Sequence, residues 1–224
     1  MKTVAVKAVQ DRSEVVARLD RRKAESRQRL LAAARALFIE RGYHATRPQD
    51  IARAADVGHG TFYLHFADKE ACFVAFAEEA RAELAAFVGK RLAGSDGVEA
   101  QLRALMAALL DYADEHPGVL KAAMTDVSVI ASDRPLGKPL IERWAEEWAS
   151  GICAGARVGA IYDDYDAEVA GHAIVGLIRG AAGCGRRRRD ELVDTVVRFL
   201  VRALVPPGAA ERAGRHNFLR DGME

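Results

Sequence analysis

The chain has 224 residues, of which half are hydrophobic and 29% are charged, and its formal net charge is +1. This balance is typical of a globular protein with a substantial core, and it argues against an extended disordered chain. No stretch approaches the roughly 18 apolar residues that a membrane-spanning helix needs, and the first residues lack a signal-peptide pattern. We therefore expect a soluble, cytoplasmic protein with no membrane partner.

The charge is unevenly distributed along the chain. Residues 1–70 hold 14 basic and 9 acidic side chains, whereas the remainder holds 19 and 23. Only the first third is basic, so it is the better place to look for a polyanionic partner.

The cysteines and histidines indicate no metal site or catalytic centre. Cys72, Cys153 and Cys184 are widely spaced and lie in no CxxC or CxxH pattern, so neither a disulfide framework nor a zinc site is expected. The six histidines form no HExxH motif, and no paired-carboxylate or nucleophile motif is present. We expect no metal, no cofactor and no enzymatic activity.

The first helix of the fold is expected to begin near Lys23. Residues 1–22 carry mixed charge and are interpreted as a flexible arm, with a frayed helix as the alternative. From there, Leu30, Ala34 and Leu37 belong to an apolar stripe at helical spacing. Gly42 is expected to end this helix, since glycine readily adopts a positive φ.

Two short helices and a longer one follow. Pro48 begins the second helix, and the third covers about 59–66 after a break at Asp56-Val57-Gly58, where we expect Asp56 to take a positive φ. Asp68 is expected to cap the fourth helix. Two tightly connected short helices are typical of a helix-turn-helix. Phe62 and Phe66, four residues apart, should face its core and turn the following residues outward: His59, Gly60, Thr61, Tyr63 and His65.

Five further helices are predicted at about 98–115, 118–131, 135–159, 165–183 and 190–204. The expected fold is therefore all-α with about nine helices. We divide it into a three-helix helix-turn-helix DNA-binding domain at 23–67, a larger helical domain at 68–205, and a flexible tail at 206–224.

The headpiece resembles the TetR family of bacterial transcriptional regulators. The residues that carry the resemblance are RQRLLAAARALFIERGYHAT and DIARAADVGHGTFYLHFADKEA, within about 27–71. The resemblance implies that Thr46, Tyr63, His65 and Lys69 touch operator phosphates, and that His59, Gly60 and Thr61 lie nearest the bases. Structural alternatives remain open for Tyr63 (packing on the fourth helix), for His65 (a backbone-bonded histidine) and for Lys69 (a solvated charge).

Three other positions near the turn are singled out. Arg47 stands where the family commonly has a Ser or Thr cap, and we predict that it adds a phosphate contact. Leu64 is expected either to contact a thymine methyl group or only to fill space. Asp56-Val57-Gly58 stands where the family usually has Gly-Val-Ser.

The resemblance also implies a ligand pocket and a dimer interface in the larger domain. Apolar and aromatic side chains of the middle helices are the pocket candidates, although such side chains are equally often core: Leu105, Met106, Leu109, Tyr112, Met124, Val127, Trp144, Trp148, Cys153 and His172. The dimer candidates lie on the last two helices, with burial inside one chain as the alternative: Gly171, Val175, Gly176, Gly180, Val193, Val196, Val197 and Leu200. The run Arg186 to Arg189 is interpreted as a solvated loop, with phosphate binding as the alternative.

The sequence thus predicts a repressor that binds a palindromic double-stranded operator as a homodimer and is released by a small, largely apolar effector. Two alternatives remain: a DNA-binding dimer without small-molecule control, in an architectural or cell-cycle role, and a transcriptional activator.

Overall fold

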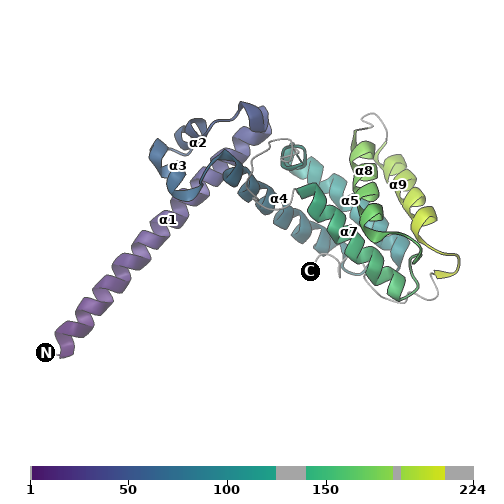
Figure 1. Cartoon of the computed structure of the whole chain (residues 1–224), viewed down its shortest axis with the longest axis horizontal. Coiled ribbons are helices and arrows are strands. Elements are labelled where there is room, and N and C mark those ends of the chain that lie inside the picture. The colour runs from purple at the N-terminus through teal and green to yellow at the C-terminus, as the bar shows by residue number, and fades with distance from the viewer. Residues whose placement is uncertain (1, 125–139, 184–187, 210–224) are drawn as a thin grey trace. The chain divides into compact units, whose positions relative to one another are not determined.

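A computed structural model describes residues 2–124, 140–183 and 188–209, and every regular element within them is an α-helix (Figure 1). The all-α prediction is confirmed for this part of the chain. The nine helices are α1 (Lys2–Ala45), α2 (Pro48–Ala54), α3 (His59–His65), α4 (Lys69–Leu92), α5 (Val98–Glu115), α6 (Val119–Ala123), α7 (Leu140–Arg157), α8 (Ala167–Ala182) and α9 (Arg189–Leu204). The predicted helical residues 125–131 and 135–139 lie outside the described residues.

The chain divides into two compact units, Met1–Phe76 and Ala77–Glu224. The sequence placed this boundary at residue 67, before α4. The difference arises because the first two turns of α4 complete the core of the smaller unit. There Phe73 packs edge-on against Phe38 and Tyr43, with ring centroids 5.2 and 5.0 Å apart. Such aromatic pairs add to the stabilisation from burial alone, so these turns belong to the headpiece.

The residues expected to form a flexible arm continue α1 toward its N-terminus. Residues 2–22 are helical and run without a break into the predicted headpiece helix. The helical alternative therefore describes this segment better than an irregular arm. At the other end of α1, Gly42 has φ 78° and ψ 169°, so the kink occurs where the sequence predicted the helix to stop.

The larger unit depends on a close approach of α7 and α8. A Cβ atom on Gly171 would lie 2.2 Å from the carbonyl oxygen of Ala145 and 3.2 Å from the backbone nitrogen of Ala149. Only glycine fits this crossing. The N-terminus of α8 is capped by Asp166, whose carboxylate accepts hydrogen bonds from the backbone N–H groups of Glu168 and Val169.

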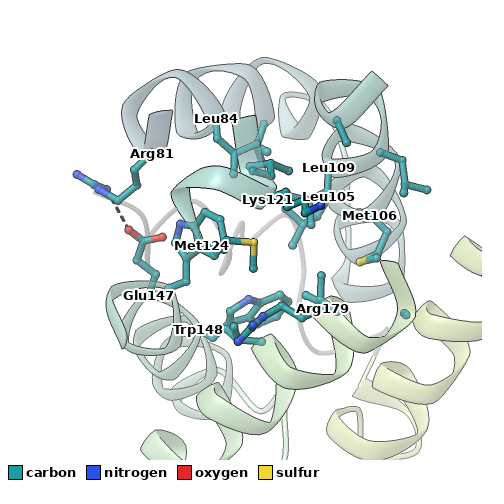
Figure 2. A pocket seen from close by; sticks show the side chains of 18 of the residues that line it. Arg81, Leu84, Leu105, Met106, Leu109, Lys121, Met124, Glu147, Trp148 and Arg179 are labelled. Atoms are coloured by element: carbon teal, nitrogen blue, oxygen red, sulfur yellow. Dashed lines mark hydrogen bonds and ion pairs between the residues drawn. The ribbon is translucent and has the colours of Figure 1, made fainter. Parts of the chain in front are cut away.

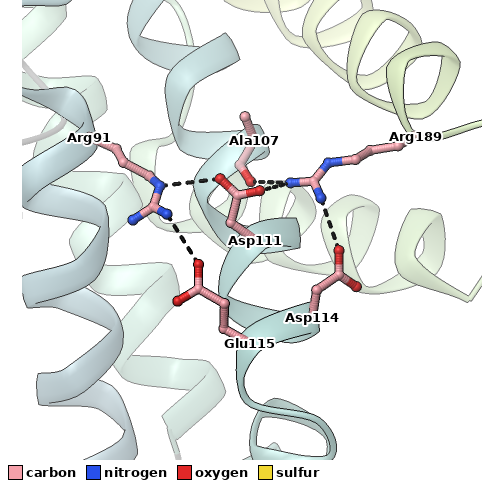
Figure 3. Close-up of polar contacts among 6 residues, drawn as sticks. All are labelled: Arg91, Ala107, Asp111, Asp114, Glu115 and Arg189. Carbon is pink, nitrogen blue, oxygen red and sulfur yellow. Dashed lines mark hydrogen bonds and ion pairs between the residues drawn. The ribbon is translucent and has the colours of Figure 1, made fainter.

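An ion-pair network at the surface joins α9 to α5 (Figure 3). Arg189 donates hydrogen bonds to the Ala107 carbonyl at 3.0 Å and to the carboxylates of Asp111 and Asp114. Arg91 of α4 contacts Asp111 from the other side, at 3.2 Å. Arg189 therefore anchors the start of α9. The sequence interpretation had instead placed it in a solvated loop. Arg186 and Arg187 lie outside the described residues.

The end of the described chain packs against the larger unit. Ala209 is buried, in contrast to the flexible tail predicted at 206–224, and residues 210–224 lie outside the described part. Within the described residues, no helix is long and apolar enough to cross a membrane.

Candidate nucleic-acid interface and cavity

The turn between α2 and α3 is built around a positive φ at Asp56. Its φ is 52°, as the sequence predicted, and it is the only non-glycine residue of the described chain with a positive φ. The turn is closed by hydrogen bonds from the Asp56 N–H to the Arg53 carbonyl (3.1 Å) and from the Val57 N–H to the Ala52 carbonyl (3.0 Å). These contacts set the direction in which α3 leaves α2.

We expect Asp56→Gly to stabilise the protein by up to about 1 kcal/mol, because glycine adopts this φ without steric cost. Thermal or urea unfolding measures the change. Asp50→Gly is the matched control: Asp50 lies inside α2 near its N-terminus, where glycine should destabilise the helix. A lower melting temperature for Asp56→Gly would contradict the proposed strain.

One face of α3 is buried and the other is open. Phe62 and Phe66 are buried, with ring centroids 5.6 Å apart, so they face the headpiece core as predicted. On the opposite face Tyr63 and Leu64 are 51% and 75% exposed. His59 and Gly60 are exposed as well, and Thr61 is half-buried. A short helix with small and polar groups on its open edge suits insertion into a major groove.

His65, at the end of α3, is tied to α1. Its Nε2 lies 2.7 Å from the Ser26 hydroxyl oxygen, and that hydroxyl donates to the Lys23 carbonyl at 3.0 Å. Because the single hydroxyl proton is used there, the Nε2 atom carries the ring proton and donates it to Ser26. Partial burial and the charges of Lys23 and Arg27 lower the pKa of His65. His65 is thus held by Ser26, and its predicted phosphate contact stays a prediction.

Lys69 is also engaged within the headpiece. Its Nζ donates to the Tyr43 carbonyl at 2.9 Å and lies 4.1 Å from the centre of the Tyr43 ring. Burial lowers its pKa. The Asp68 carboxylate accepts a hydrogen bond from the Ala71 N–H at 2.7 Å, which confirms the predicted cap of α4. The predicted phosphate contact of Lys69 and free N–H groups at this terminus stays a prediction, although Asp68 already takes the Ala71 N–H group there.

Thr46 and Arg47, adjacent in sequence, lie in opposite environments. Thr46 is only 1% exposed, and its hydroxyl donates to the Gly42 carbonyl at 2.8 Å. Its predicted phosphate contact is thus replaced by a structural role, closing the end of α1. Arg47 is exposed, precedes α2 and makes no capping hydrogen bond, so its guanidinium is available to a partner.

Two basic residues that the sequence interpretation did not select lie beside α3. Lys23 and Arg27 are exposed residues of α1, close enough to His65 to influence its pKa. The Arg27 guanidinium carbon lies 5.0 Å from the centre of the Phe66 ring. The basic composition of residues 1–70 indicated such a surface, but only the packing of α1 against the end of α3 identifies these two positions.

The larger unit contains a cavity of about 510 Å³ between α4, α5, α6, α7, α8 and α9 (Figure 2). This volume is within the usual range of small-molecule sites. Six of the predicted pocket residues line it: Leu105, Met106, Leu109, Met124, Trp144 and Trp148.

The other pocket candidates do not line this cavity. Tyr112 is buried elsewhere, with its hydroxyl donating to Glu83 at 3.1 Å. Cys153 is exposed, and His172 is exposed with its Nδ1 lying 3.0 Å from the Glu168 carbonyl oxygen. Val127 lies outside the described residues. Helical spacing alone could not distinguish the cavity wall from core or surface.

Charged residues of the cavity wall were missed from sequence. Arg81 of α4 and Glu147 of α7 face each other at 3.0 Å, and Lys121 and Arg179 also line the cavity. Burial raises the pKa of Glu147, against the opposing effect of the Arg81 charge. No group of His, Cys, Asp and Glu in the described residues could hold a metal ion.

Most of the predicted dimer residues are buried inside one chain. Val193, Val196, Val197 and Leu200 form the inner face of α9, which packs mainly on α5. Gly171 is buried against α7, and Val175 lines the cavity. Only Gly176 and Gly180 are exposed. The broad apolar stripe of α9 therefore indicated an intrachain neighbour, the alternative noted from sequence.

The exposed edge of α3, held by a helix-turn-helix core, together with a helical unit that encloses an apolar cavity, defines a DNA-binding transcriptional regulator. The family model for bacterial regulatory proteins of the tetR family matches residues 30–76. The helix-turn-helix repressor KstR2 of Rhodococcus jostii (strain RHA1) is 31% identical over 153 residues, which cover 66% of this chain and 74% of that protein. The chain belongs to the TetR family.

Other similarities extend over most of the chain. The repressor DhaR of Mycobacterium sp. (strain GP1) is 25% identical over 185 residues, covering 80% of this chain and 92% of that protein. Among solved structures, an ArpA-like γ-butyrolactone receptor matches with a TM-score of 0.58 and 25% identity, covering 90% of this chain and 96% of that one. The similarity thus includes the larger unit as well as the headpiece.

Proposed function

We propose that this protein is a repressor that binds a palindromic operator as a homodimer and releases it when a small molecule occupies the cavity. The observation that carries the proposal is the open edge of α3, held outward by the buried Phe62 and Phe66. KstR2 and DhaR are both named repressors, which favours repression over activation.

The proposed DNA contacts fall into two groups. His59, Gly60 and Thr61 begin α3 and would approach base edges, where glycine allows close approach and the other two offer polar groups. Leu64, which is 75% exposed, would meet a thymine methyl group. Phosphate contacts would come from the exposed basic side chains Arg47, Lys23 and Arg27, and from the Tyr63 hydroxyl.

We expect Arg47→Ala to weaken operator binding. The slope of log affinity against log salt concentration should also become shallower by about one, because one phosphate contact is lost. The measurement is the dissociation constant at several salt concentrations. Arg157→Ala, which removes another exposed arginine at the end of α7, is the matched control. An unchanged affinity and slope for Arg47→Ala would contradict the contact.

The dimer is proposed to form through the outer face of α8. Val169, Ala173, Gly176 and Gly180 are exposed at helical spacing, and Val169 is 67% exposed. Small residues allow two such helices to approach closely. Phe199, 61% exposed on α9, adds a large apolar side chain.

Val169→Glu should convert the dimer into monomers, because the substitution places a charge in an apolar interface. Sedimentation at micromolar concentration measures the change. Val158→Glu, at another exposed valine after α7, should leave the dimer intact. A wild-type protein that sediments as a monomer, or a dimeric Val169→Glu variant, would contradict the proposed interface.

Ligand control would operate as a shift between two populations of the dimer. The second part of α4 contributes Arg81, Leu84 and Val88 to the cavity wall, and the first part belongs to the headpiece. A ligand that prefers one position of this helix would therefore bias the headpieces. The available free energy is the difference in ligand affinity between the two states.

The experiment that tests the proposal is selection of genomic DNA fragments by the purified full-length protein. A repressor of this kind should enrich a palindromic site that overlaps a promoter, and a cognate small molecule should release it. Enrichment without a palindrome would refute the dimeric operator model. A site that overlaps no promoter, or that no effector releases, would favour an architectural role, and a site upstream of the promoter would favour activation.

A further inference from the structure

The charges of the cavity wall are unbalanced. Most of the wall is apolar, and the charged side chains that line it are Arg81, Lys121, Glu147 and Arg179. Arg81 and Glu147 form an ion pair at 3.0 Å, so they neutralise each other. Among the described residues, neither Lys121 nor Arg179 has a hydrogen-bond or ion-pair partner. The charged side chains of the described wall therefore sum to a net charge of +2.

These two cations belong to the more exposed part of the wall, together with Ala113 and Gly183. Lys121 and Arg179 are exposed, whereas Leu105, Met106 and Val175 are buried. The cations come from α6 and α8 and line the same cavity as the buried side chains (Figure 2). The two cations are thus accessible from solvent, and buried apolar side chains line the same cavity.

A cationic ligand does not fit this arrangement. Its natural partner would be Glu147, but that carboxylate is already held by Arg81, which also contacts Glu78 at 3.4 Å. A neutral ligand could accept hydrogen bonds from Lys121 and Arg179, but it would leave their charges unpaired. An anionic group beside these cations, by contrast, would gain charge-assisted hydrogen bonds, which are about twice as strong as neutral ones.

We propose that the effector is an anionic amphiphile, with its apolar part inside the cavity and its carboxylate paired with Lys121 or Arg179 at the exposed part of the wall. This inference rests on the proposed function in that it assigns a ligand class to the effector cavity. It concerns binding to the protein alone and so can be tested without DNA.

The chain offers an internal reporter for the test. Its two tryptophans, Trp144 and Trp148, both line the cavity. Tryptophan fluorescence of the full-length protein therefore reports on occupancy of this site. The probes are octanoate, decanoate and dodecanoate, with decanol and γ-decalactone as neutral comparisons and decylamine as the cationic one.

We expect decanoate to bind at least tenfold more tightly than decanol, γ-decalactone or decylamine, which matches the loss of charged hydrogen bonds. Each added methylene of the carboxylates should improve affinity about fourfold until the cavity is filled. In the double variant Lys121→Gln, Arg179→Gln, decanoate should bind at least tenfold more weakly, while decanol binding stays unchanged. Lys90→Gln, an exposed lysine of α4 that does not line the cavity, is the matched control.

Equal affinity for decanoate and the uncharged ligands, an unaffected double variant, or no binding by any carboxylate would overturn the inference. Failure of the proposed function would look different. Decanoate that binds through Lys121 or Arg179 but does not release operator DNA would support the ligand class and contradict ligand control.

Discussion

Replacing Tyr63 with alanine should weaken operator binding by about 10–100-fold while leaving the fold intact. The hydroxyl is proposed to donate to a phosphate, and a hydrogen bond to a charged group contributes about 1.5–3 kcal/mol. The side chain is half exposed, and its ring meets His59 edge-on with centroids 5.3 Å apart. Its removal should therefore change the melting temperature little. Affinity for the selected operator and thermal unfolding are the two measurements.

Tyr63→Phe separates the hydroxyl from the ring. If the phosphate contact dominates, the phenylalanine variant should lose most of the affinity that the alanine variant loses. Tyr165→Phe, which removes an exposed hydroxyl bonded to the Ala203 carbonyl in the larger unit, should bind DNA as the wild type does. Wild-type affinity in Tyr63→Ala would contradict the assigned DNA-binding edge.

Gly171→Ala should destabilise the larger unit by about 1–3 kcal/mol, because the new methyl group would collide with backbone atoms of α7. For a chain of this size, that loss corresponds to a fall in Tm of roughly 2–12 °C. Helix α7 cannot relieve the collision by a side-chain rotation, since the nearest atom is the Ala145 carbonyl oxygen.

Gly176→Ala, five residues further along α8, is the matched comparison. A Cβ atom at Gly176 would meet nothing within 4 Å, so the protomer should keep or gain stability through the better helix propensity of alanine. Because Gly176 lies on the proposed dimer face, its variant should instead weaken dimerisation. Equal melting temperatures for Gly171→Ala and the wild type would contradict the close crossing of α7 and α8.

The headpiece could be predicted from sequence because its signals are local. Phe62 and Phe66, the positive φ at Asp56 and the Asp68 cap each follow from residue type and spacing within a few positions. The ends of α5 were also predicted correctly, because Gly97 precedes it and Pro117-Gly118 follows it closely.

The surfaces of the larger unit could not be predicted in this way, because they depend on which helices become neighbours. The apolar stripe of α9 specifies burial, but whether α5 or a second chain covers it depends on the packing of distant segments. Gly171 and Gly176 look alike in sequence, yet one lies against α7 and the other faces open space. The burial of Thr46 depends likewise on the kink at Gly42, because the Gly42 carbonyl accepts a hydrogen bond from the Thr46 hydroxyl.

The most direct measurement of the central claim is a comparison of the operator sequences selected from random DNA by the wild-type protein and by His59→Ala. His59 is exposed at the start of α3. If this helix reads the major groove, the wild type should select a palindrome, and the variant should lose base preference at one symmetric pair of positions while the rest of the site persists. An identical preference at every position would contradict a base contact by His59, and the absence of any palindrome in the wild-type selection would contradict the whole account.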